Sequence, residues 1–169
     1  KGLVEVRDVI LPSLQSQLDE LAGSLKNEIN AVHNQGTAFP ATPSSLTGTR
    51  TIIDAAKQRI KIEGGDVRFT IFDKSGNQVS TASLIGDIGF SEGTIEEMTT
   101  AIQNWLTSPT GGNMPEAVAQ IDKNGHLTIQ TGDSEYSISI MDQVSSTPGS
   151  DQGSVTIKFA GNNTLNYDR

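Results

Sequence analysis

The residues that could carry out chemistry in this chain are few and far apart. Its two histidines, His33 and His126, have no second histidine or carboxylate at a spacing typical of metal ligands. Serine is common, but no Gly-x-Ser-x-Gly motif or histidine partner predicts a nucleophile. The chain has no cysteine, which excludes thiol catalysis, disulfide bonds and cysteine-bound metal. We therefore predict no catalytic residue, no cofactor and no metal site, and we expect that the protein is not an enzyme.

Three groups of acidic residues are better interpreted as a turn and as solvated helix faces than as a calcium site or acid–base pairs. Residues 73–77 begin like a calcium-binding loop, but a glycine precedes Asn77 and no glutamate follows at the required distance. A hairpin turn is therefore favoured there. The acidic pairs 19–20 and 96–97 are adjacent on predicted helices and point in different directions, so we expect solvated helix faces rather than acid–base pairs.

Charge and composition narrow the classes of partner. The chain has 20 acidic and 12 basic residues and a net charge of -8, which disfavours nucleic acid and anionic membranes as partners. Aromatic residues make up 5%, too few for a deep aromatic-walled pocket. No apolar run approaches the roughly 18 residues of a membrane span, and the first residues do not resemble a signal peptide. We expect either a cytosolic protein or an export signal outside this segment.

A helical pattern near the N-terminus is the strongest structural signal. Apolar residues recur at steps of three, four and seven, which predicts a helix that begins at Leu11 or Pro12 and stops at Gly36. The predicted helix packing face consists of Leu11, Leu14, Leu18, Leu21, Leu25, Ile29 and Val32. This nearly heptad stripe requires a partner surface. Two partners remain open: another helix of the same chain, or a neighbouring subunit.

A change of period marks a second region. From Val67 onward apolar residues alternate, which predicts a hairpin of strands 67–72 and 78–84. A helix over 94–106 follows, with Thr94 and Glu97 as a capping box and one apolar stripe that consists of Ile95, Met98, Ile102 and Trp105. Further strands are predicted over 117–121, 126–131, 136–140 and 154–160. The expected outer-domain core consists of Phe69, Ile71, Met98, Ile102, Trp105, Leu127 and Ile129.

Together these elements predict an α+β fold, with a long N-terminal helical arm followed by a mainly antiparallel β domain and one covering helix. Residues 1–36 are expected to form the arm, as part of a helical core domain. Residues 37–65 lack a clear period and contain several Pro, Ser, Thr and Gly residues, which predicts a linker with a short helix or turn. Residues 66–169 are expected to form an α+β outer domain.

Two stretches resemble a known family. Residues 6–12, 17–22 and 29–36 read VRDVILP, QLDELA and INAVHNQG. They are similar to the long helix of the hook-associated protein 1 family, the junction proteins between hook and filament of the bacterial flagellum. Residues 93–102 and 117–129 read GTIEEMTTAI and AVAQIDKNGHLTI. They resemble the small repeat of flagellins and hook-associated proteins, while the terminal helices of the family are missing here.

The resemblance implies an axial protein that is exported through the flagellar secretion apparatus and lies outside the cell. Its implied partners are the hook protein, the second junction protein and further copies of itself in a ring, with no nucleic acid, membrane or cofactor. The family's long helix usually packs on a helix of its own chain. Two alternatives remain: a filament cap or flagellin-like subunit, and a secreted carbohydrate-binding or adhesive module.

Overall fold

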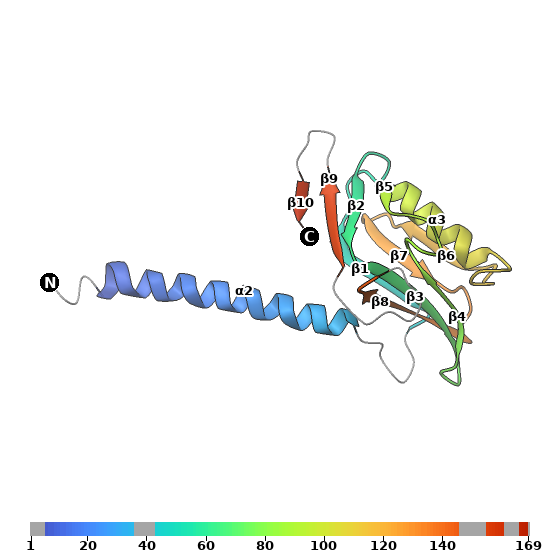
Figure 1. Cartoon of the computed structure of the whole chain (residues 1–169), viewed down its shortest axis with the longest axis horizontal. Coiled ribbons are helices and arrows are strands. Elements are labelled where there is room, and N and C mark those ends of the chain that lie inside the picture. Colours follow the sequence, from blue (N-terminus) through green and yellow to red (C-terminus); the bar gives the residue numbers. More distant parts are fainter. Residues whose placement is uncertain (1–5, 36–42, 146–154, 161–165, 169) are drawn as a thin grey trace. The chain divides into compact units, whose positions relative to one another are not determined.

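The computed structural model describes residues 6–35, 43–145, 155–160 and 166–168 (Figure 1). The chain divides into two compact units, Lys1–His33 and Asn34–Arg169. The described residues of the first unit are helical, and the second unit contains the described strands and the helix α3, Ile95–Thr107.

The described residues of the first unit belong to a short π-helical segment, η1, Val6–Ile10, and to the helix α2, Leu11–Gln35, whose last two residues lie in the second unit. The predicted helix is therefore present, and its start and end agree with the expected ones. Pro12 is the second residue of α2, and the π-helical segment Val6–Ile10 lies immediately before it, as expected where a proline without a backbone N–H interrupts the regular helical hydrogen bonds. The helix ends at the residue before Gly36, where the sequence favours termination.

The described residues of the second unit form three antiparallel sheets, which confirms the α+β class. Their strand orders are β1-β7-β6, β10-β9-β2-β5 and β4-β3-β8. The elements are β1 (Ser45–Thr51), β2 (Arg59–Gly64), β3 (Asp66–Asp73), β4 (Gln78–Ser83), β5 (Glu92–Thr94), α3 (Ile95–Thr107), β6 (Val118–Ile121), β7 (His126–Gln130), β8 (Tyr136–Gln143), β9 (Thr156–Ala160) and β10 (Asn166–Asp168).

Strands β1 and β2 correct the prediction of a linker with a short helix or turn over residues 37–65. Strand β2 carries the period-two signal itself, because Ile60 and Ile62 are buried and Arg59 and Lys61 are exposed. Strand β1 carries no such signal, since six of its seven residues are exposed. Its conformation depends on antiparallel pairing with β7, which a local pattern does not reveal.

The β3–β4 and β6–β7 hairpins close with the same turn. In the first, Asp73 donates its N–H to Asn77 and accepts one from Gly76. In the second, Asp122 bonds in the same way to residues 126 and 125. Gly76 and Gly125 have φ values of 79° and 82°, the left-handed region where a glycine carries no steric cost. The predicted hairpin turn at residues 73–77 is therefore present.

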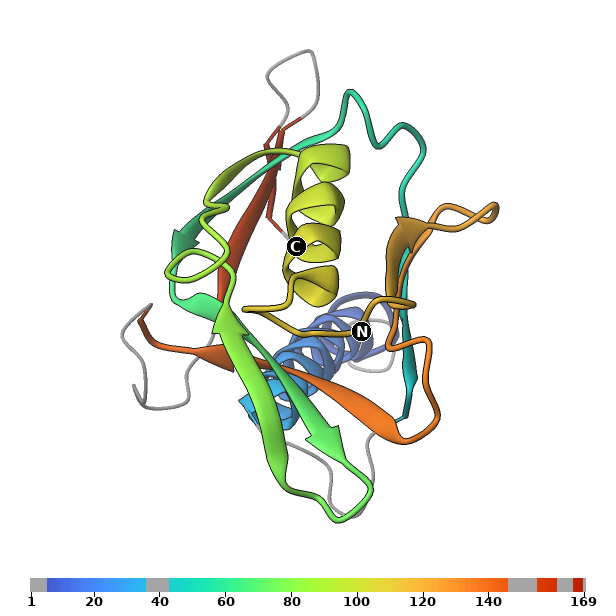
Figure 2. The same ribbon diagram turned by 90° about the vertical axis from the view of Figure 1, so that its right-hand side faces the viewer.

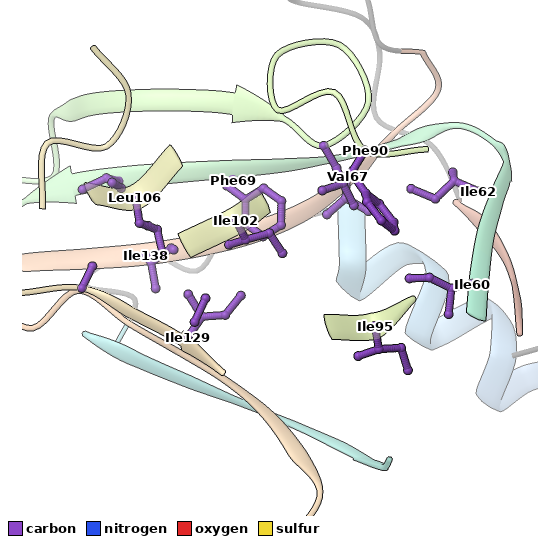
Figure 3. Packing of buried hydrophobic residues seen from close by; sticks show 14 of the residues in the cluster. Ile60, Ile62, Val67, Phe69, Phe90, Ile95, Ile102, Leu106, Ile129 and Ile138 are labelled. Atoms are coloured by element: carbon purple, nitrogen blue, oxygen red, sulfur yellow. The ribbon is translucent and has the colours of Figure 1, made fainter. Parts of the chain in front are cut away.

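A single hydrophobic cluster joins the sheets and α3 (Figure 3). Four of the predicted core residues are at most 2% exposed: Phe69, Ile71, Ile102 and Ile129. The other three are partly buried and pack against this cluster: Met98, Trp105 and Leu127. Figure 3 shows Phe69 of β3 beside Ile102 of α3. The core thus lies entirely within the second unit.

The buried face of α3 differs from the predicted stripe. It contains Ile95, Thr99, Ile102 and Leu106, which lie within an arc of about 60° at 100° per residue. Met98 and Trp105 lie about 60–80° to one side of Ile95, and this rotation explains why both remain partly exposed. Figure 2 shows α3 between the sheet that contains β2 and β9 and the sheet that contains β6 and β7.

Candidate functional site

The main candidate interaction surface is the apolar stripe of α2, here called the α2 stripe. At 100° per residue its seven members fall within an arc of about 80°. Six of them are 49–64% exposed: Leu11, Leu14, Leu18, Leu21, Leu25 and Ile29. The side chain of Val32 lies outside the described residues. A stripe this narrow is typical of a coiled-coil seam rather than of a helix lying on a sheet.

The energetics of α2 favour a partner. Most of the stability of a helix in a protein comes from packing of its apolar face rather than from helix propensity. Each leucine of the stripe would contribute about 1.5–3 kcal/mol on full burial. In the first unit the described residues comprise η1 and part of α2 only. Both interpretations, a helix of the same chain or one of another subunit, therefore remain predictions.

The candidate ligand residues of the β domain are occupied by their own turns. The Oδ1 atom of Asp73 accepts the N–H groups of Ser75 and Asn77 at 2.8 and 2.9 Å. The Oδ1 atom of Asp122 accepts those of Asn124 and His126 at the same distances. These carboxylates stabilise hairpin turns, which is the interpretation that the sequence favoured over a calcium loop.

These hydrogen bonds also shift the acidity of the two turn residues. The side-chain hydrogen bond from Asn77 lowers the pKa of Asp73, with help from the backbone N–H groups of the turn. The backbone N–H of His126 lowers the pKa of Asp122. In both cases the bonds favour the charged form of the carboxyl group. Both carboxylates are therefore fully ionised at neutral pH.

A buried carboxylate, Asp66, escaped the sequence analysis. It is 0% exposed and lies at the start of β3. Its Oδ1 atom accepts the N–H groups of Val67 and Ile85 at 2.7 and 2.9 Å, and its Oδ2 atom accepts that of Gly86 at 3.3 Å. Three backbone donors satisfy this group, so it connects β3 to the loop after β4 and is not a free acid or base.

The described residues contain no group of three or more His, Asp or Glu side chains placed to hold an ion. His126 is half-buried at the start of β7. His33 lies in α2, and its side chain is outside the described residues. The acidic residues Glu96 and Glu97 are exposed in the first turn of α3, where a helix favours negative charge.

Glu97 has a structural role in that turn. Its Oε2 atom accepts the N–H of Thr94 at 2.7 Å, and the Thr94 hydroxyl accepts the N–H of Glu97 at 3.1 Å. This reciprocal pair is the predicted capping box. It satisfies two backbone donors at the start of α3 and fixes where the helix begins.

Trp105 contributes to packing and to a surface groove. Its ring centroid lies 6.0 Å from that of Phe69, with the rings tilted by 43°, a favourable aromatic arrangement. It also lines a groove of about 530 Å³ together with hydroxyl and amide groups that include Ser80, Thr81 and Asn104. Such a lining has the mixture of aromatic and polar groups found in sugar-binding sites. The carbohydrate-binding alternative stays a prediction.

A second groove, here called the β6-edge groove, involves a residue that sequence reasoning missed. It is about 600 Å³ in volume and is lined by the loop 53–56, one face of α3 and the edge of β6. At its base the side-chain amide of Gln103 donates to the carbonyl of Ala117 at 2.8 Å and accepts the N–H of Ala119 at 2.6 Å. No sequence pattern marks a glutamine that pairs with a strand edge.

Comparisons with known proteins do not identify the chain. No protein-family model, curated protein sequence or solved structure matches it. None of the helices in the described ranges combines the length and the hydropathy needed to cross a bilayer.

Proposed function

We propose that this chain is a structural subunit of the bacterial flagellum that joins the hook to the filament through protein–protein packing. The observation that carries the proposal is the exposed, narrow α2 stripe, whose six described leucine and isoleucine side chains are 49–64% exposed. Its partners are the hook protein, the second junction protein and further copies of the chain in a ring. In this proposal α2 is a helical arm that belongs to a helical core domain.

The shape of the α2 stripe supports an assembly role. Helices with a heptad-like apolar seam associate because each knob residue inserts between four residues of the facing helix. The sequence of the same segment also resembles the long helix of the hook-associated protein 1 family. A subunit that passes torque between two lattices needs long, specific contacts of this kind.

The β domain supports a non-catalytic role. Its buried carboxylate Asp66 is bonded to three backbone N–H groups. The acidic residues of its two matched turns, Asp73 and Asp122, are likewise bonded to their own backbone. Carboxylates that are hydrogen-bonded in this way stabilise the fold rather than take part in a reaction. We propose that this domain faces outward from the axial structure, in the extracellular space.

Immunogold labelling in the source bacterium tests the proposal directly. Antibodies raised against the purified chain should label a single position at the base of each filament, where it meets the hook. Label at the distal tip would indicate the cap alternative, and label along the whole filament would indicate a flagellin-like subunit. Label that is absent from flagella would overturn the proposal.

A pair of substitutions tests whether the α2 stripe drives assembly. Leu18→Glu introduces a charge at the centre of the stripe and should prevent incorporation, so that cells lose filaments and swimming motility. Ser16→Glu adds the same charge about 160° away on the helix and serves as the matched control. If the Leu18→Glu protein is incorporated as well as the wild type, another surface drives assembly.

A further inference from the structure

The β6-edge groove combines an open strand edge with fixed walls. Strand β6 is an outer strand of the sheet β1-β7-β6. Ala119 donates its N–H to Gln103 and therefore away from β7. Because peptide groups alternate in direction along a strand, the carbonyl of Ala119 and both peptide groups of Ile121 also point toward this open edge. The groove thus presents a short row of backbone donors and acceptors.

Gln103 already pairs with half of this edge as a strand would. Its amide bonds to the carbonyl of Ala117 and to the N–H of Ala119, the two groups that a neighbouring antiparallel strand would use. The half of the edge from Ala119 to Ile121 lines the groove. A row of unpaired backbone groups of this kind is a template for pairing with an extended segment.

Three backbone hydrogen bonds hold the opposite wall in place. Ile52 donates its N–H to Gly125 at 2.7 Å and ties the loop to the β6–β7 turn. The carbonyls of Ala55 and Gln58 each accept an N–H from the first turn of α3 at 3.0 Å. The groove is therefore preformed, and a ligand need not order its walls, which lowers the cost of binding.

Within this wall Ile53 is the most exposed large apolar side chain of the described residues, at 92%. It lines the groove, whereas its neighbour Ile52 is buried in the core. Small side chains line the groove beside it, namely Ala55, Ala56 and Ala119, which lets a second backbone approach closely. An exposed isoleucine beside a strand edge can cover an apolar side chain of a bound segment.

The charge of the groove indicates the character of its occupant. Asp54 and Glu96 line it, and no lysine or arginine does. Lys57 pairs with Asp54 at 3.1 Å, whereas none of the ion pairs among the described residues involves Glu96. A second copy of a chain with a net charge of -8 is disfavoured there. A basic partner is favoured.

We infer that the β6-edge groove binds an extended segment of a partner protein by strand addition along Ala119–Ile121, with alternating apolar and basic side chains toward Ile53 and Glu96. The inference does not depend on the flagellar assignment, since it rests on the β domain alone. It would give the domain a peptide-binding role in addition to any role of α2.

Fluorescence anisotropy with the whole chain tests the inference. The probe is a short fluorescein-labelled peptide that alternates valine and lysine. Binding should weaken about tenfold or more in Ile53→Ser, because an apolar contact is lost. It should weaken about two- to fivefold in Glu96→Gln, because one exposed charge is removed. Val79→Ser, which alters a 49% exposed valine on β4, is the matched control and should change nothing.

Two further peptides separate strand addition from other modes of binding. The same peptide with N-methyl groups on the amides of one edge cannot form the strand bonds and should not bind. A peptide that alternates valine and glutamate should also fail to bind. The amide resonance of Ile121 should shift in the heteronuclear NMR spectrum only with the lysine peptide.

Several results would overturn the inference. These are no binding of the lysine peptide, equal binding of the N-methylated or glutamate peptide, or equal affinity in Ile53→Ser. Self-association of the wild type that Ile53→Ser abolishes, measured by sedimentation, would instead show that a second copy occupies the groove. Circular dichroism of each variant distinguishes loss of binding from loss of folding.

Discussion

At the scale of single residues, the carboxylates of this chain act through geometry rather than reactivity. Asp73 and Asp122 occupy equivalent positions in two hairpin turns, and each accepts two backbone N–H groups through one oxygen. Both turns begin with Asp-Lys and have a glycine three positions after the aspartate, whereas the residue before that glycine differs, being Ser75 in one and Asn124 in the other. This recurrence reflects the demands of the turn, which needs a local acceptor and one left-handed residue.

The lowered pKa of Asp73 predicts how pH affects stability. Because the folded pKa lies below the unfolded one, ionised Asp73 stabilises the fold fully above about pH 4, and this stabilisation is lost as pH falls further. Asp73→Asn should lower the urea midpoint at neutral pH, and the difference from wild type should shrink below about pH 4. Asp19→Asn on α2 is the control, and a difference that stays constant with pH would contradict the explanation.

Leu106 is the residue for which burial makes the sharpest prediction. It lies on the buried face of α3 and is 0% exposed, although the predicted stripe did not include it. Leu106→Ala should reduce the free energy of unfolding of the β domain by about 3 kcal/mol, within the usual range for a buried leucine. Leu106→Met keeps the volume and should cost less than about 1.5 kcal/mol. Equal midpoints for alanine variant and wild type in urea denaturation would show that the side chain is not packed.

At the scale of elements, the two helices differ in where their apolar faces lie. The buried face of α3 contributes to the core with four residues, Ile95, Thr99, Ile102 and Leu106. The described part of the α2 stripe remains exposed. A helix that buries its face within the domain stabilises the fold, whereas one that exposes a narrow seam is available for assembly. This difference is why we assign assembly to α2 and scaffolding to α3.

The start of α3 offers a test of an element boundary. Thr94→Ala removes the hydroxyl that accepts the N–H of Glu97, and it should destabilise the β domain by about 1 kcal/mol. Thr94→Ser keeps the acceptor and should retain most of the stability. Thermal or urea unfolding measures both. If serine were as costly as alanine, the packing of the threonine methyl group would matter more than the cap.

At the scale of the whole molecule, the two units differ in whether their apolar residues are buried in a core. The hydrophobic core comprises residues between Ile52 and Val155 and includes no residue of α2. The β domain therefore contains its own stabilising contacts. The described residues of α2 instead carry an exposed apolar stripe, which we propose is buried against a partner. This division agrees with our proposal of a subunit that assembles through α2 and presents the β domain on its outside.

This division predicts that the β domain folds alone. A chain that lacks residues 1–35 should show the same near-ultraviolet circular dichroism from Trp105 and the same urea midpoint as the full chain. The reason is that every residue of the core cluster is retained. A midpoint that falls clearly on truncation would show that α2 contributes to the stability of the β domain.

Several features could be predicted because they depend on neighbours in sequence. The bounds of α2 follow from Pro12 and Gly36, and the capping box of α3 follows from two residues three apart. The turn at residues 73–77 follows from its aspartate and glycine. These are local interactions, so the sequence by itself determined them. It also determined the α+β class, since a helical period near the N-terminus is followed by the period of two that is typical of strands from Val67 onward.

Only the tertiary structure decided which elements pair and which surfaces they leave open. Strand β1 has almost no buried residues and exists because β7 pairs with it, about 80 residues away along the chain. The same holds for Gln103, which becomes part of a strand edge because α3 packs beside β6. The rotation of α3 also placed Leu106 in the core and moved Trp105 to its margin. These outcomes depend on contacts between distant segments, and a hydrophobic pattern read along the chain contains no information about which segments meet.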